Sequence, residues 1–317
     1  MNQEVLEQLL TLFVLMAIGF GVTKTGLMDK VASDKISALI SRVAMPAMYL
    51  STFMSQQFSA DSLKKSGILI AISVVYYLLA TVIGFLYVRL VRADEKSRGV
   101  YHFMVIFANA AYMGFPVLRA VLGEEAIFYG AFFNLPFNIL AYSLGIWLLR
   151  RGRSDVTLRK QEMFLNPGTL GVLLGVVLFL LSPLFEGTAV YSYVYQGVIW
   201  KGLDLIGDMT VPLSMLVIGS VLATVKPGAV VKNGRVWGVC VLRLLVMPVM
   251  MFLLLQPFHL DPMTLGIPVL ITGMPCAVFC VILSKEYGGD EKTGSVGVFL
   301  STLCSAATIP LITCLLK

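Results

Sequence analysis

Long apolar stretches alternate with short polar joints along almost the whole chain. The stretch between residues 67 and 88 carries no charged side chain, and about 20 apolar residues are enough for a helix to cross the hydrocarbon core of a bilayer. Glycine, proline and charged residues gather at the joints, where they interrupt helices. The pattern predicts an all-α polytopic membrane protein with ten transmembrane helices, near residues 5–23, 33–54, 67–90, 99–121, 124–149, 168–185, 194–223, 234–256, 262–285 and 292–316.

The basic residues give these predicted helices a direction across the membrane. Most of the 24 lysines and arginines fall at every second joint, and the largest group lies between residues 150 and 160. Cytoplasmic loops are the ones that accumulate basic residues. We therefore expect a multi-pass protein of the cell (cytoplasmic) membrane, with this central linker inside and both chain termini outside.

Composition agrees with a membrane protein and excludes several other classes. Hydrophobic residues make up 58% of the chain and charged residues only 13%, with a mean hydropathy of +0.86, whereas soluble domains carry about 25% charged residues. This excludes soluble enzymes, secreted disulfide scaffolds and disordered chains. The net charge of +6 is explained by basic cytoplasmic loops, so no nucleic acid partner is expected. Glu4 and Glu7 stand where a signal peptide would be basic, so the first helix is expected to be retained.

The five cysteines give no indication of a disulfide or a metal site. All of them lie in apolar stretches and none forms a CxxC motif. We interpret them as small buried apolar residues, and no metal or cofactor is expected.

The two halves of the chain resemble each other. Leu39-Ile40 precedes Pro46 as Leu205-Ile206 precedes Pro212, and Gly123-Glu124-Glu125 has its counterpart in Gly289-Asp290-Glu291. The division gives a first repeat over residues 1–158 and a second over 159–317, each with five predicted helices. Because five is odd, the second repeat enters the membrane from the opposite side. Inverted repeats of this kind are common in secondary transporters, whose substrates bind near the middle of the membrane at interrupted helices.

Helix breakers within the fourth and ninth predicted helices suggest where such a site would lie. The fourth contains Asn109, Gly114 and Pro116, and the ninth contains Thr272, Met274 and Pro275. Proline removes a backbone donor and glycine lowers the cost of unwinding, and unpaired backbone groups at membrane depth occur only where they are buried in protein or line a cavity. One such segment is equally consistent with an ordinary proline kink. Two at equivalent positions favour broken crossover helices that form a substrate site.

Polar residues near these breaks fit a site for an anion. Asn134 and Asn138 share one face of the fifth predicted helix, and Ser301 and Ser305 share one face of the tenth. Together with Asn109 and the free N–H groups of helix N-termini, amides and hydroxyls form a neutral cradle for a carboxylate. Hydrogen bonding between packed helices is the alternative role for the same residues.

These features resemble the auxin efflux carrier family, in particular its compact bacterial permease-like members and, more distantly, the plant PIN transporters. The resemblance covers nearly the whole chain and is carried by the stretch from Asn109 to Pro116 with Asn134, and by four later segments, Met274-Pro275, Ser284 to Tyr287, Ser301-Thr302 and Thr308 to Pro310. It implies a secondary transporter for a small organic anion with an elevator-like mechanism. The implied scaffold comprises residues 1–56 and 167–225, and the implied moving transport domain comprises 62–150 and 230–317. The central linker is short, which favours the bacterial type over an auxin carrier.

Two charged residues fall inside predicted helices at equivalent positions of the two halves, Arg42 and Asp208. Intramembrane charges are costly and are commonly functional. Either they form a structural ion pair, with Arg42 also able to reach the inner surface, or Asp208 binds a coupling H⁺ or Na⁺ and Arg42 acts on the substrate or in gating. The ion pair is the slightly favoured interpretation. Arg243 lies about two turns into its helix and is also able to extend toward the surface.

Other functions remain as alternatives to a transporter. An intramembrane enzyme would need a catalytic cluster, and the sequence shows no serine–histidine, paired-aspartate or metal-ligand arrangement. A receptor or a channel would not need two broken helices. The sequence leaves open which anion is carried, in which direction and with which coupling ion. Gly171 and Gly175 permit close helix packing, within the chain in the favoured interpretation or at the seam of a homodimer.

Overall fold

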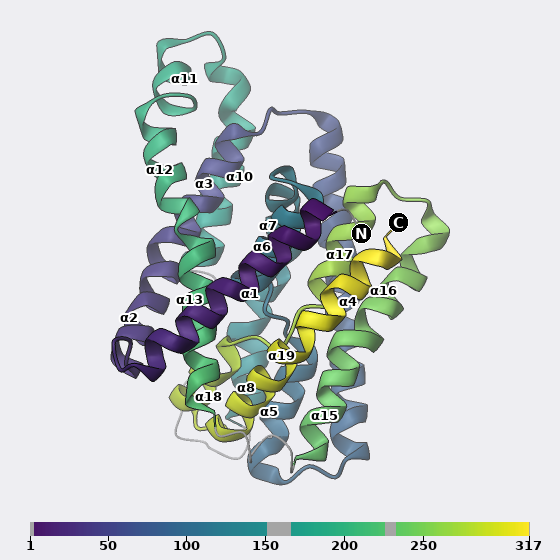
Figure 1. Ribbon diagram of the computed structural model, residues 1–317. Helices are drawn as coiled ribbons and strands as arrows, with labels where there is room; N and C mark the ends of the chain where they lie inside the picture. The colour runs from purple at the N-terminus through teal and green to yellow at the C-terminus, as the bar shows by residue number, and fades with distance from the viewer. Residues whose placement is uncertain (1–2, 151–165, 226–232, 317) are drawn as a thin grey trace.

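The computed structural model describes residues 3–150, 166–225 and 233–316 and is built from helices (Figure 1). Within these residues the β-structure is limited to one isolated bridge. The α-helices are α1 (Gln3–Lys24), α2 (Lys30–Leu39), α3 (Met45–Ser55), α4 (Ala60–Leu90), α5 (Glu95–Ile106), α6 (Phe115–Leu122), α7 (Glu125–Leu140), α8 (Ile146–Leu149), α10 (Pro167–Phe185), α11 (Ala189–Val194), α12 (Val198–Asp208), α13 (Thr210–Thr224), α15 (Gly234–Val241), α16 (Met247–Leu255), α17 (Pro262–Thr272), α18 (Phe279–Tyr287) and α19 (Glu291–Leu315).

The described helices make this a multi-pass membrane protein. Eight helical segments are long and apolar enough to cross a bilayer, and two shorter apolar helices, Ala110–Leu122 and Pro262–Thr272, occupy the remaining predicted positions. The second predicted helix is α2 and α3 joined by a π-helical turn. The seventh is α12 and α13, which are separated only at Met209 and lie within one apolar helical segment, Tyr191–Thr224.

Three π-helical segments each lie directly before a proline within a helical stretch. They span Ile40–Ala44, Ala110–Gly114 and Leu242–Val246, and each ends two residues before a proline, at Pro46, Pro116 and Pro248. A proline cannot donate its backbone nitrogen and its ring clashes with the carbonyl one turn earlier. Widening that turn to the π form removes the clash without ending the membrane-spanning helix.

Glycines allow the closest helix contacts. A Cβ atom at Gly19 of α1 would lie 2.3 Å from the carbonyl oxygen of Leu216, and one at Gly219 of α13 would lie 2.0 Å from that of Met16. α1 and α13 therefore touch backbone to backbone. Gly171 and Gly175 of α10 approach α3 in the same way, because their Cβ atoms would meet the Pro46 backbone at 2.9 Å and the Phe53 ring at 2.6 Å. These two glycines thus serve packing within the chain.

α1 packs along α13, and α3 lies against both α10 and α12, while α4 packs on α5 and α7, α16 on α17, and α19 on α15 and α18. These sets also touch one another, because α7 contacts α3 and α10, and α1 contacts α6. In Figure 1 the turns after α4 and after α18 lie at the lower end of the bundle, and the turns after α3 and after α10 lie at the upper end, toward which α19 also runs. The predicted central linker lies outside the described residues except at its two ends.

The five cysteines are all free. Cys240, Cys276 and Cys280 are buried as expected, and Cys304 is partly exposed. Cys314, near the end of α19, is exposed, so the expectation of burial is wrong there.

Candidate functional site

Two helices break where the sequence places its helix breakers, and the broken segments meet. α5 ends at Ile106 and α17 ends at Thr272. The chain then runs without helix, and the backbone N–H of Asn109 donates to the oxygen of Pro275 at 2.8 Å, while that of Ala277 donates to the oxygen of Phe107 at 3.2 Å. Ala108 and Cys276 face each other as one antiparallel bridge. Backbone groups released by the two breaks therefore satisfy one another in the buried interior.

Several of the predicted site residues converge on this bridge. Ser301 of α19 accepts from the Cys276 N–H at 3.0 Å and donates to Gly297 O at 2.7 Å. The next polar residue on that face, Ser305, donates to Thr302 O at 2.6 Å and lies 3.9 Å from the Met113 sulfur. These serines anchor the second broken segment and the turn that precedes Pro116.

Gly114 and Met274 are also neighbours across the two broken segments. A Cβ atom at Gly114 would lie 3.5 Å from Met274 Cγ. Gly114 closes the π-helical turn in front of α6, and Pro116 lies in the first turn of α6, directly after that widened turn. The Thr272 hydroxyl donates back to Val269 O at 3.2 Å, within its own helix.

Three buried amides at the site have polar atoms without hydrogen-bond partners in the described part of the chain. These atoms are Asn109 Nδ2, both polar side-chain atoms of Asn134, and Asn138 Nδ2. The Asn134 amide lies beside the Tyr49 hydroxyl of α3, and Asn138 lies 3.5 Å from the Cβ position of Gly168 at the start of α10. Buried polar groups are nearly always paired, so this set is suited to a polar ligand.

Arg243 is the site residue that the sequence analysis missed. Its side chain is fully buried, so it does not extend toward the surface. The guanidinium donates to the oxygens of Val105 at 2.9 Å, Thr272 at 3.1 Å, Met274 at 3.3 Å and Ile106 at 3.5 Å, and also to the Tyr76 hydroxyl. The sequence signal was a charge inside an apolar helix, which is a functional candidate by default.

The position of Arg243 explains how two broken helices are held together. Val105 and Ile106 end α5, and Thr272 ends α17. The last carbonyls of a helix have no intrahelical donors and carry partial negative charge. A guanidinium offers five donors in one plane, so this single side chain satisfies the C-terminal ends of both helices at once.

The hypothesised ion pair between Arg42 and Asp208 is wrong. Asp208 pairs instead with Arg119 of α6 at 3.2 Å, and Arg119 also lies 2.9 Å from Glu124. The Asp208 side chain is 57% exposed, and Arg42 is exposed as well. The sequence repeat placed these residues at matching positions, but the partner of Asp208 comes from a different helix.

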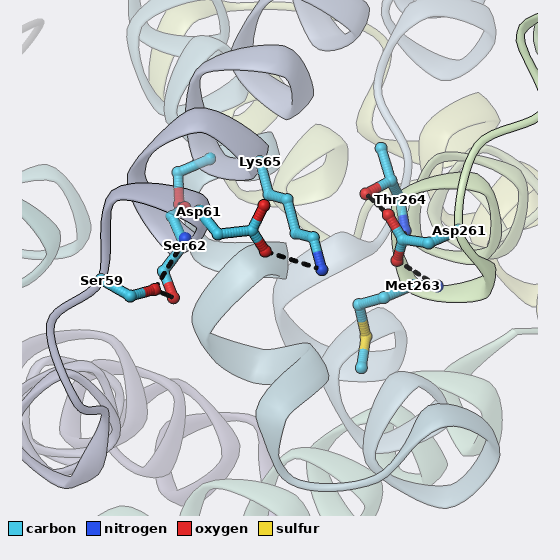
Figure 2. Close-up of polar contacts among 8 residues, drawn as sticks. Ser59, Asp61, Ser62, Lys65, Asp261, Met263 and Thr264 are labelled. Carbon is cyan, nitrogen blue, oxygen red and sulfur yellow. Dashed lines mark hydrogen bonds and ion pairs between the residues drawn. The ribbon is translucent and has the colours of Figure 1, made fainter.

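A second polar cluster fixes the starts of α4 and α17 (Figure 2). Asp61 pairs with Lys65 at 3.2 Å, and Asp261 accepts from the N–H groups of Met263 and Thr264 and from the Thr264 hydroxyl at 2.6 Å. Burial alone would raise the pKa of Asp261, but the Thr264 hydrogen bonds and the charge of Lys65 outweigh it and hold that pKa below its ordinary value. The cluster caps the helix that leads into the second break.

The fold and the joined breaks define a polytopic helical membrane protein with an interrupted interior, and sequence comparison identifies its family. The sequence model of the family described as membrane transport protein matches residues 4–163 and 156–313. The chain belongs to this family, which is that of the auxin efflux carriers. It is therefore a membrane transport protein.

Two archaeal relatives are similar over almost their whole length. An uncharacterized transporter of Methanocaldococcus jannaschii is 24% identical over 316 residues, covering 96% of this chain and 97% of the relative. An uncharacterized transporter of Methanothermobacter thermautotrophicus is 25% identical over 317 residues, covering 96% of each.

Proposed function

We propose that the protein is a secondary transporter that moves a small organic anion, preferably a carboxylate, across the cell membrane. The observation that carries this proposal is the group of buried amides without partners, Asn109, Asn134 and Asn138, beside the junction of two broken helices. Each amide offers donors for a carboxylate oxygen without adding a competing charge.

The helix ends around the junction favour an anion over a cation. Arg243 already satisfies the carbonyl ends of α5 and α17. The helix starts that follow the breaks, at Ala110–Gly114 and at α18, have no side-chain cap, and helix N-termini attract negative charge.

The packing supports a ten-helix architecture with two inverted five-helix repeats. The eight long segments together with the two interrupted helices would give ten crossings, and the interrupted ones would stand fourth in the range 1–158 and fourth in the range 159–317. In this proposal the bridge between Ala108 and Cys276 is the crossover of the two repeats.

The packing also supports an elevator-like movement. The scaffold proposed from residues 1–56 and 167–225 contains the packed pair of α1 and α13 and the packed set of α3, α10 and α12. The transport domain proposed from 62–150 and 230–317 contains the packed sets of α4, α5 and α7, of α16 and α17, and of α15, α18 and α19. Asn134 faces Tyr49 of the scaffold, and Asn138 faces Gly168 of the scaffold. The amides would therefore move along the scaffold surface with a bound anion.

In this proposal, coupling to an ion depends on one ion pair between the scaffold and the transport domain. The pair between Asp208 of α12 and Arg119 of α6 joins scaffold and transport domain. Sliding of one domain past the other would open this pair and free Asp208 to take up H⁺ or Na⁺.

Counterflow in proteoliposomes tests the proposed function. Vesicles preloaded with an unlabelled carboxylate should accelerate uptake of the same labelled carboxylate from outside, because a carrier exchanges its substrate. Uptake that does not respond to internal substrate would identify a channel and contradict the proposal. So would transport of cations or neutral solutes with no carboxylate flux across a panel of mono- and dicarboxylates.

A further inference from the structure

A pocket of about 500 Å³ lies where α4 ends and α5 begins. Its lining includes the apolar residues Phe85, Leu86 and Val88. It also includes three cationic residues, Arg89, Arg92 and Arg98. The turn between the two helices lies at the lower end of the bundle in Figure 1.

The arginines of this pocket have no carboxylate partner among the described residues. Asp94, in the same turn, pairs with Arg235 at 3.1 Å instead. Arg89 and Arg92 are exposed, and Arg98 is half-buried. Three cations that line one pocket repel each other, so an anion bound among them would relieve that repulsion.

An apolar stripe on α4 leads directly to the pocket. The exposed residues Val75, Leu78, Val82, Phe85 and Leu86 recur at intervals of three and four, which places them on one face of the helix. Leu86 belongs both to this stripe and to the pocket lining. A ligand that reaches from the arginines along the stripe must therefore have an anionic head and a long apolar chain.

We propose that the pocket binds an anionic phospholipid, with its phosphate among Arg89, Arg92 and Arg98 and an acyl chain along the α4 stripe. Guanidinium groups match phosphate oxygens in a two-point geometry. A basic pocket at the edge of the hydrocarbon core is a typical site for an anionic headgroup. A free phosphate would use the arginines but not the stripe, so the combination favours a lipid. The inference is independent of the anion that the protein transports.

Native mass spectrometry of the full-length protein in detergent tests this site. The protein is titrated with phosphatidylglycerol, with phosphatidylcholine of the same chains, and with inorganic phosphate. We expect phosphatidylglycerol to bind at least about tenfold more tightly than phosphatidylcholine, and the double variant R89Q/R92Q to lose at least about tenfold of that affinity.

A charge-matched control separates the pocket from the general surface charge. K35Q/K96Q removes two exposed cations outside the pocket and should keep the affinity of the unaltered protein. A second variant, Leu86→Gln, should weaken lipid binding and leave the protein folded, because this side chain is 63% exposed.

Three results would overturn the proposal. Equal losses in R89Q/R92Q and K35Q/K96Q would show only diffuse attraction to surface charge. Equal affinity for both phospholipids would exclude recognition of an anionic head. Inorganic phosphate that binds as tightly as phosphatidylglycerol, with Leu86→Gln unchanged, would make the ligand a free phosphate and exclude the lipid.

Discussion

At the scale of single residues, Arg243 carries more hydrogen bonds than any other side chain discussed for the site. A buried charge is costly unless its surroundings satisfy it, and four carbonyl oxygens with one hydroxyl do so here. The same bonds satisfy carbonyls that would otherwise be unpaired at membrane depth. The arginine and the two broken helices thus depend on each other.

Arg243→Gln should destabilise the fold by about 3 kcal/mol or more, because several buried carbonyls lose their donor together. The stability of Arg243→Lys should lie between that of Arg243→Gln and that of the original protein, since an ammonium keeps the charge but has three donors instead of five. Thermal unfolding in detergent measures both. Arg42→Gln is the matched control. Because Arg42 is exposed, this variant should have the melting temperature of the original protein. Equal losses for Arg42→Gln and Arg243→Gln would contradict this role.

Asn109→Ala should abolish high-affinity substrate binding while the protein folds normally. The side-chain nitrogen has no partner to lose, and the bond to Pro275 comes from the backbone, which alanine keeps. A lost hydrogen bond to a charged ligand costs about 1.5–3 kcal/mol, which is roughly 10- to 150-fold in affinity. Uptake kinetics in proteoliposomes measure the change, with Gln57→Ala at an exposed turn as the control. Unchanged affinity would show that Asn109 serves packing alone.

At the scale of helices and their contacts, two kinds of contact matter. Glycines set how closely α1 and α13 approach, and one ion pair joins α6 to α12. The backbones of α1 and α13 touch because Gly19 and Gly219 leave no side chain between them. Arg119 connects α6 to α12 through Asp208. The first contact is backbone to backbone, whereas the second is a partly exposed ion pair.

Gly19→Ala should destabilise the protein by about 2 kcal/mol or more, because its Cβ atom would meet the Leu216 carbonyl at 2.3 Å and force two backbones apart. Gly21→Ala on the same helix is the matched control. Nothing lies within 4 Å of its Cβ position, so alanine there should be neutral or slightly stabilising through its helix propensity. Melting curves that fall equally for both variants would refute the close contact.

Asp208→Asn should change the stability of the fold by no more than about 1 kcal/mol, since a partly exposed ion pair contributes little. A double-mutant cycle should give a small coupling between Asp208 and Arg119 and none between Asp208 and Arg42. Gradient-driven uptake then tests the coupling role. Loss of driven uptake with exchange intact would support it, and full driven uptake by Asp208→Asn would eliminate it.

At the scale of the whole molecule, the direction of the chain across the membrane is the property that the proposed mechanism requires. An odd number of crossings in each half inverts the second half relative to the first. The basic residues of the joints predict that the turn between α4 and α5 is cytoplasmic. The turn after α10, at the opposite end of the bundle in Figure 1, would then be external.

Cysteine labelling with an impermeant reagent in intact cells checks this direction. In a background with the exposed Cys314 changed to serine, a cysteine placed at Glu186 should react from outside. A cysteine placed at Lys96 should react only after the membrane is opened, because that turn is predicted to be inside. External labelling at position 96 with none at 186 would reverse the orientation.

The sequence by itself determined the class of protein and the places where its helices fail. Apolar length decides whether a segment spans a bilayer, and this is a local property. The breaks after Ile106 and after Thr272 were also predictable, because glycine and proline act on the turn in which they stand. The same local chemistry predicted Asn109 and Pro275 as candidate site residues from the sequence alone.

Only the tertiary structure decided which distant groups meet. Arg243 looked like a residue near a membrane surface, yet it lies among the ends of α5 and α17. Asp208 matched Arg42 in the repeat, yet its ion-pair partner in the structure is Arg119. A partner in space depends on how helices rotate and cross, and hydropathy along one helix carries no information about its neighbours. The chain thus specifies its helices segment by segment, whereas its buried charges acquire their roles only when the helices pack.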